Sequence, residues 1–165
     1  MGFFAYELAL DDVERVFQRY RWGYRREEEL LFTVFDHVPM VFLADADLNV
    51  LMLFSQIVPG EGARGAIAAT PERAQSAQAY LLAANYRLTL GTFSRDHRDG
   101  EIRYECSQVV PEPLSDDLVH IMVIAATGAV TRHGPTIIRL LRGQTTLPQA
   151  LAALERDSDA ATLAG

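Results

Sequence analysis

The sequence contains few of the residues that carry common chemistry. Cys106 is the single cysteine among 165 residues, so an internal disulfide is excluded and a buried, reduced thiol is the expected state. Lysine is absent and all 15 basic residues are arginine, an absence to which we attach no function. No apolar run approaches the roughly 18–20 residues that span a bilayer. The opening residues also lack the basic region and long apolar core of a signal peptide. We therefore expect a cytoplasmic protein that does not enter a membrane.

Cofactor and metal motifs are also missing. There is no GxxxxGK[ST] phosphate loop, and residues 60–65, the nearest approach to a dinucleotide glycine pattern, are not followed directly by a helix start. The four histidines lie in separate segments, without an HExxH or CxxC pattern. Asp45 and Asp47 are not followed by the glycine and distal glutamate of a calcium loop. The sequence therefore predicts neither a cofactor nor a bound metal.

One segment brings together residues suited to acid–base catalysis. Asp96, His97 and Asp99 fall in a predicted hairpin loop, with Ser94 and Cys106 as the nearby nucleophiles. A general base needs a nucleophile within hydrogen-bond reach, whereas polar residues at a hairpin tip are ordinarily solvated. We interpret this loop as a solvated turn.

Acidic residues outnumber basic ones. The formal net charge is −7 and the pI is about 5.0, so the surface repels phosphate backbones and direct nucleic-acid binding is not expected. The densest arginine cluster, Arg19, Arg21, Arg25 and Arg26, is followed by glutamates at 27–29 and is interpreted as a solvated, self-compensating face. Electrostatic steering would favour a basic protein partner, such as one that itself handles nucleic acid.

The length and composition predict one globular domain of the α+β class. The chain of 18.3 kDa is 49% hydrophobic and 22% charged, which are ordinary globular values. We assign residues 1–157 to a single domain and 158–165 to a disordered tail. The expected elements are a helix capped at Asp11, strands at 30–35, 40–44 and 50–57, a mobile loop at 59–69, a helix from Thr70 to Leu88, a hairpin at 88–110, a helix from Ser115 interrupted at Gly134 and Pro135, a turn-rich piece at 136–142, and a helix at 148–156.

The three consecutive strands have an unusual pattern. The segments LLFTVF, MVFLA and VLMLF do not alternate between apolar and polar residues, so both faces of this meander are apolar. An antiparallel sheet normally leaves one face wet. Either helices cover both faces, or a second copy or another protein covers one of them.

Two segments resemble a known family. LLAANYRLTLGTFSRDHRDGEIRYECSQVV resembles the helix-to-hairpin core of the bacterial YbjN-like proteins, and TRHGPTIIRLLRGQTTLPQALAAL resembles their C-terminal helices. The resemblance covers about the last half of the chain. It implies an α-β-β-β-α-β-β-α sandwich similar to type III secretion chaperones, with an antiparallel sheet packed by helices, homodimer formation and the binding of client proteins.

These observations favour a non-catalytic chaperone or adaptor that works as a homodimer. A small-molecule-sensing or signal-transduction regulator is the alternative, and an unrecognised enzyme is the third hypothesis. A sensor requires an enclosed pocket with convergent polar groups, whereas an adaptor requires an open apolar groove or sheet edge. For the adaptor we predict partner binding by the apolar surface or a strand edge of the hairpin at 40–57, with loop 59–69 as a movable rim. The predicted protein-binding residues are Met40, Phe42, Met52, Leu53 and Phe54.

Overall fold

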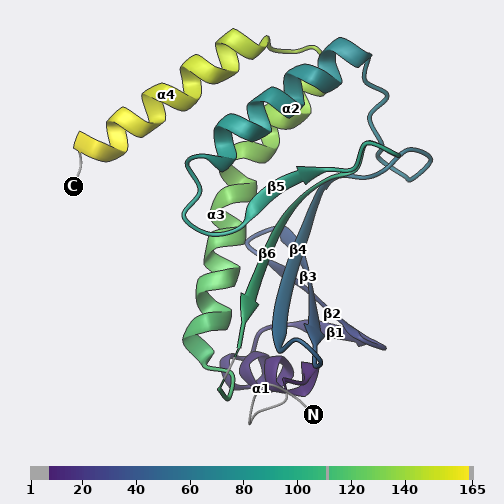
Figure 1. Ribbon diagram of the computed structural model, residues 1–165, viewed down its shortest axis with the longest axis vertical. Coiled ribbons are helices and arrows are strands. Elements are labelled where there is room, and N and C mark those ends of the chain that lie inside the picture. Colours follow the sequence, from purple (N-terminus) through teal and green to yellow (C-terminus); the bar gives the residue numbers. More distant parts are fainter. Residues whose placement is uncertain (1–7, 111, 164–165) are drawn as a thin grey trace.

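The computed structural model describes residues 8–110 and 112–163, with side chains described as far as Arg156. The elements follow the order α1 (Leu10–Tyr20), β1 (Tyr24–Glu27), β2 (Leu30–Phe35), β3 (Val38–Asp45), β4 (Val50–Val58), α2 (Pro71–Asn85), β5 (Thr92–Arg95), β6 (Ile102–Val109), α3 (Asp116–Leu141) and α4 (Leu147–Leu163). One antiparallel sheet contains all six strands in the order β1-β2-β3-β4-β6-β5 (Figure 1). The predicted α+β sandwich is confirmed, and β1 is an additional strand.

Short turns between the strands set their register. Asp36 and His37 both have positive φ, as a two-residue hairpin loop between β2 and β3 requires. Between β3 and β4, the Asp45 carboxylate accepts a hydrogen bond from the Leu48 N–H at 3.0 Å, and Asn49 adopts positive φ. Asn49 is buried, and its side-chain oxygen accepts a hydrogen bond from the Leu8 N–H at 2.8 Å. These turns bring residues 30–58 into one continuous meander.

The helix starts follow the predicted capping chemistry with one shift. Thr70 accepts a hydrogen bond from the Arg73 N–H, and Ser115 accepts one from the Leu118 N–H, so both predicted caps are confirmed. At α1 the helix begins at Leu10 instead of after Asp11. There the Asp12 side chain accepts a hydrogen bond from the Ala9 N–H at 3.0 Å.

The predicted interruption of α3 is wrong. The helix continues through Gly134 and Pro135 to Leu141. Proline removes one backbone hydrogen bond, but Pro135 lies on the exposed side of the helix, where water can reach the freed carbonyl. On the opposite side His133, Gly134 and Ile137 are buried, so packing holds the helix together across the proline.

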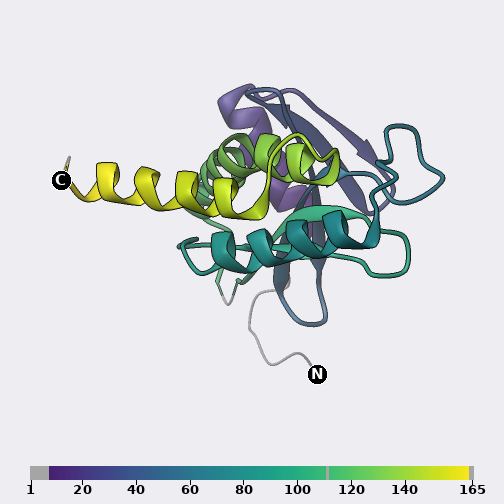
Figure 2. The same cartoon turned by 90° about the horizontal axis from the view of Figure 1, so that it is seen from above.

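The C-terminal helix is longer than predicted. α4 continues past Arg156 to Leu163, through most of the segment assigned to a disordered tail. Figures 1 and 2 both show α4 extending away from the rest of the molecule. Ala164 and Gly165 lie outside the described residues. The assignment of residues 1–157 to one domain stays a prediction.

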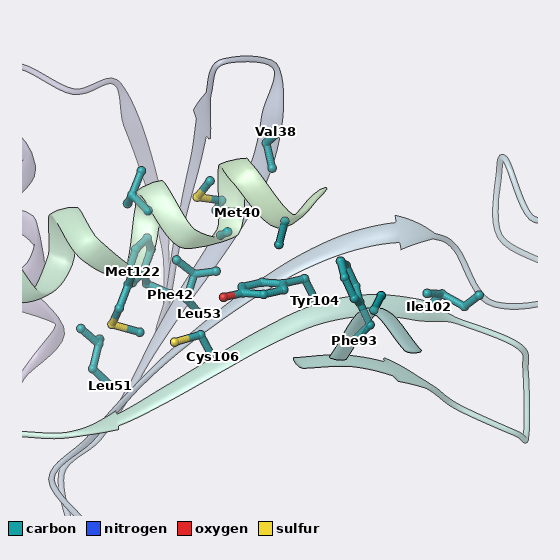
Figure 3. Close-up of a cluster of buried hydrophobic side chains, with 14 of the residues drawn as sticks. Val38, Met40, Phe42, Leu51, Leu53, Phe93, Ile102, Tyr104, Cys106 and Met122 are labelled. Atoms are coloured by element: carbon teal, nitrogen blue, oxygen red, sulfur yellow. The ribbon is translucent and has the colours of Figure 1, made fainter. Parts of the chain in front are cut away.

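One face of the sheet carries the hydrophobic core. Phe42, Leu53 and Tyr104 point from neighbouring strands toward Met122 of α3, as Figure 3 shows. From α1, the Phe17 ring meets the Phe42 ring edge-on, with centroids 5.4 Å apart. All four helices lie on this side of the molecule, and we call it the covered face (Figures 1 and 2). None of the helices in the described ranges combines the length and apolar character needed to traverse a lipid bilayer.

Residues 81–110, the first segment that resembles the YbjN-like proteins, hold β5 against this core through specific hydrogen bonds. The Asn85 side chain donates to the Phe93 carbonyl at 2.8 Å and accepts from the Phe93 N–H at 2.7 Å. Gly91 has a φ of 72°, and a Cβ there would lie only 2.2 Å from the Tyr104 hydroxyl oxygen. That hydroxyl donates to the Leu90 carbonyl at 2.8 Å. Asn85, Gly91 and Tyr104 of this segment therefore have a structural role.

Candidate functional site

The second face of the sheet, which we call the open face, is apolar at its centre. The strand register aligns one residue from each strand in a row across this face: Arg25, Phe32, Val41, Phe54, Glu105 and Thr92. The row begins at an arginine, passes three apolar side chains, and reaches a glutamate beyond them. Neighbouring positions on the same face add Leu30, Val34, Leu43 and Met52. Among the described residues, no helix packs against this face.

A groove of about 880 Å³ lies on the open face. Phe32, Val41 and Phe54 line its apolar centre, and Val34 at its side is 66% exposed. The groove is thus open to solvent along the sheet. It differs from an enclosed pocket in which polar groups converge on a small ligand.

Two arginines lie over the phenylalanine rings of the groove. The Arg25 guanidinium is 5.2 Å from the Phe32 ring centroid, and the Arg103 guanidinium is 4.9 Å from that of Phe54. Each arginine also contacts a carboxylate on its own strand, Glu27 and Glu105, at 3.2 Å. Exposed cation–π contacts contribute about 0.5–1 kcal/mol each. The two arginines are therefore weakly bound over an apolar surface that is otherwise exposed to solvent.

The five predicted protein-binding residues divide between the two faces. Met40, Phe42 and Leu53 are at most 1% exposed and pack under the helices on the covered face. Their inclusion in an accessible binding surface is therefore corrected, because side chains alternate along a strand and these three point inward. Met52 and Phe54 lie half-buried on the open face. That these two residues bind a partner stays a prediction.

Two details of the predicted surface are also corrected. The hairpin at 40–57 has no free strand edge, because β3 pairs with β2 and β4, and β4 pairs with β3 and β6. The sheet ends instead at β1 and β5. Loop 59–69 lines a different cavity, together with the hairpin loop after β5, and does not line the open-face groove. The Glu61 N–H donates to the Asp99 carbonyl at 2.7 Å, which ties the two loops together.

Several residues of the groove were missed at the sequence level. Arg25 belongs to β1, which was not predicted because charged residues have low strand propensity. The predicted self-compensation of its cluster holds for Arg25, which pairs with Glu27, whereas Arg26 pairs with two carboxylates of α1 and Arg19 pairs with one of α3. The signal that could have identified Phe32 and Val41 is the two-residue turn at Asp36 and His37. Once that turn is placed, it sets the two residues opposite each other.

The hairpin loop does not assemble a nucleophile with a base. Arg98 forms an ion pair with Asp96 at 2.6 Å, and this hydrogen bond holds the pKa of Asp96 below its usual range. Asp99 accepts a hydrogen bond from the Glu101 N–H at 3.0 Å. Both carboxylates thus stabilise the turn itself, as expected for a hairpin tip.

Cys106, the cysteine nearest to the hairpin loop in the sequence, lies on the covered face. It is 2% exposed, beside Leu53 and Tyr104 in the core (Figure 3). Burial raises the pKa of the Cys106 thiol, so the reactive thiolate is disfavoured near neutral pH. Within residues 8–110 and 112–163, no group of three or more His, Cys, Asp or Glu side chains is placed to hold a metal ion.

Comparison with solved structures identifies the fold. YbjN from E. coli superimposes with a TM-score of 0.56 at 12% identity, over 83% of this chain and 94% of that chain. An uncharacterised protein from Methanothermobacter thermautotrophicus gives 0.58 at 10% identity, over 81% and 99%. A chain of the HopA1–SchA chaperone–effector complex gives 0.47 at 12% identity, over 82% and 96%. No family model and no curated protein matches the sequence. The fold is that of YbjN, and at these identities the similarity concerns the fold alone.

Proposed function

We propose that this chain, which has the fold of YbjN, is a non-catalytic protein-binding module that acts as a chaperone or adaptor for a client protein. The observation that carries the proposal is the open face, an apolar sheet surface that the described helices leave uncovered. Contiguous apolar surface of this kind usually marks an interaction site. The chaperone–effector complex among the structural neighbours describes the binding of other proteins. It identifies no residue of the groove in this chain.

The groove suits an extended apolar segment of the client. Its centre is lined by Phe32, Val41 and Phe54, and Met52 lies one row away on the same face. Phenylalanine and methionine supply adaptable contacts for more than one apolar sequence. Both edges of the sheet end in strands of four residues, and β1 consists largely of charged side chains. Binding across the face is therefore favoured over the addition of a strand at an edge.

The net charge of −7 favours a client that is basic outside its apolar segment, such as a protein that handles nucleic acid. Homodimer formation and a cytoplasmic location complete the proposal. The groove is open and apolar, which supports the adaptor over the small-molecule sensor.

The test compares four baits in affinity capture from the native cell with quantitative mass spectrometry. Wild type and Leu82→Glu should retain the client, because Leu82 is an exposed apolar residue of α2 on the helical side of the molecule. Phe54→Glu and Val41→Glu should lose it by at least tenfold while their circular dichroism and melting temperatures stay close to wild type. Raising the salt concentration should slow association of a basic client.

If all four folded baits retained the same proteins, the open face would not be the surface that binds the client. Loss from the Leu82→Glu bait as well would show that the loss of capture is not specific to the open face, which would contradict the proposed binding site.

A further inference from the structure

The cavity beside loop 59–69 has a volume of about 420 Å³ and is separate from the open-face groove, with which it shares no lining residue. It lies between this loop and the hairpin loop after β5, and the two loops meet at the same end of the sheet (Figure 1). Ala74 of α2 and Leu141 of α3 also line it. Small-molecule sites usually have volumes of about 300–1,000 Å³. The cavity is therefore large enough for a small organic molecule.

Arg95, the last residue of β5, lines this cavity with a guanidinium group that lacks a partner. Its Nε atom is buried and has no hydrogen-bond partner among the described residues. None of the ion pairs between those residues includes Arg95. Buried donors without a partner are rare, because such a group loses its hydrogen bonds to water and gains none in exchange. An acceptor from outside the chain would satisfy this donor.

The other charged groups around the cavity leave Arg95 uncompensated. Arg98, the second arginine of the lining, already pairs with Asp96 at 2.6 Å. The Asp99 carboxylate accepts a backbone hydrogen bond within its own loop at 3.0 Å. Glu61 is exposed and forms no ion pair with the described residues. One positive charge is thus available to a ligand, whereas the carboxylates of Glu61 and Asp99 would repel an anion that carries two charges.

The remaining lining of the cavity is largely apolar. It includes Ile67 and Ala69, which are half-buried, and Leu141, which is buried. A guanidinium presents parallel N–H groups that match the two oxygens of a carboxylate. Apolar side chains next to this group suit a ligand whose carboxylate is attached to a hydrocarbon chain.

We infer that this cavity binds a monocarboxylate with a short apolar chain, whose carboxylate accepts hydrogen bonds from Arg95. Ile67, Ala74 and Leu141 contact the chain of the ligand. The inference goes beyond the proposed function, because it assigns a small-molecule site that is independent of the client groove. A ligand held there would contact both loops at once.

The experiment titrates the ¹⁵N-labelled full chain with hexanoate and follows it by NMR. Hexanoate should bind with a Kd of about 1 mM or tighter, shifting the Arg95 Nε–H resonance together with amide resonances of residues 60–69. Hexanamide, which lacks the charge, and inorganic phosphate should each bind at least tenfold more weakly. If hexanoate does not bind, or if hexanamide or phosphate binds equally well, the inference is overturned.

Two arginine variants test the residue that recognises the carboxylate. Arg95→Gln should weaken hexanoate binding at least tenfold, with the melting temperature of the free protein within about 2 °C of wild type. Arg64→Gln is the matched control, because Arg64 is an exposed arginine of loop 59–69 that does not line the cavity. It should keep the affinity within about twofold. Equal affinities of the two variants, whether weakened or unchanged, would remove Arg95 from the site.

Ala74→Leu tests the apolar part of the site and leaves Arg95 in place. Wild type should bind hexanoate at least tenfold more tightly than acetate, because each buried methylene contributes about a fourfold gain in affinity. The added side chain should reduce this preference to about threefold or less, since it fills space that the ligand chain occupies. An unchanged preference would contradict the proposed position of the chain.

The open-face variant separates this inference from the proposed function. Phe54→Glu should bind hexanoate like wild type, and Arg95→Gln should still capture the client, because the groove and the cavity share no residue. Loss of hexanoate binding in Phe54→Glu would overturn the independence of the two sites.

Discussion

The two faces of the sheet are built from the same kinds of residue, but helices bury one face and leave the other accessible to solvent. On the covered face Phe42 and Leu53 are fully buried beneath α1 and α3, whereas on the open face Phe32 and Phe54 lie half-buried beneath two arginines. Hydrophobicity is thus similar on both sides of β3 and β4. The difference lies in which residues have a partner within the chain. A strand that is apolar on both faces identifies an interaction surface only after the helices have been assigned to one face.

The largest effect is expected from placing the same charge on each face. Phe42→Glu should destabilise the fold by about 4 kcal/mol or more, because it removes a packed ring and buries a carboxylate. Phe54→Glu should cost less than about 1 kcal/mol, because its side chain reaches water. Urea denaturation followed by circular dichroism measures both values. Equal losses would contradict the distinction between the faces.

A smaller effect should follow from disturbing the close contact between Gly91 and Tyr104 beside β5. Gly91→Ala should cost about 2–4 kcal/mol, because the added Cβ combines positive-φ strain with a clash against the Tyr104 hydroxyl. Gly62→Ala is the matched control, since Gly62 also has positive φ but no atom lies within 4 Å of its Cβ position. It should cost about 1 kcal/mol, from strain alone. Thermal denaturation measures the stability of both variants. Similar losses of stability would show that the contact with Tyr104 does not contribute to the effect of Gly91→Ala.

The smallest effect concerns titration on the covered face. Burial raises the pKa of Tyr104 above its ordinary value of 10.0 and the pKa of Cys106 above 9.0. In both groups the folded state holds its proton more tightly than the unfolded state. The stabilisation is therefore complete below pH 9 and is lost as the pH rises above that value. Between pH 8 and pH 11 the free energy of unfolding should fall by about 1 kcal/mol from Tyr104.

The control for this prediction is Tyr104→Phe. It should be less stable than wild type at pH 8, because the Leu90 carbonyl loses its donor. Its stability should, however, decline less between pH 8 and pH 11. Parallel pH profiles for the two proteins would show that Tyr104 does not contribute to the decline.

The sequence predicted the elements better than the faces. Turn residues such as Asn49 and caps such as Thr70 and Ser115 act locally, so the order of helices and strands could be predicted. The sequence could not show that Met40 and Leu53 are buried. Residues on both faces of these strands are apolar, so no alternation of apolar and polar residues indicates which face packs against the helices. Only the contacts from α1 and α3 decide which side is covered.

Two further differences have tertiary causes. β1 forms because its backbone pairs with β2, although Arg25 and Arg26 are poor strand formers. α3 continues through Pro135 because buried neighbours hold the helix, which overrides the local preference of proline. The groove on the open face also depends on such long-range packing. Sequence periodicity alone identified apolar segments without showing which of their side chains stay accessible.

The arginines over Phe32 and Phe54 have a consequence for the behaviour of the free protein. An exposed apolar sheet surface is a hazard for precipitation at high concentration. A guanidinium over each ring places a charge beside the apolar surface, where it stays in contact with solvent. The protein can therefore remain dispersed without a client, and an incoming apolar segment has to displace only two weak contacts.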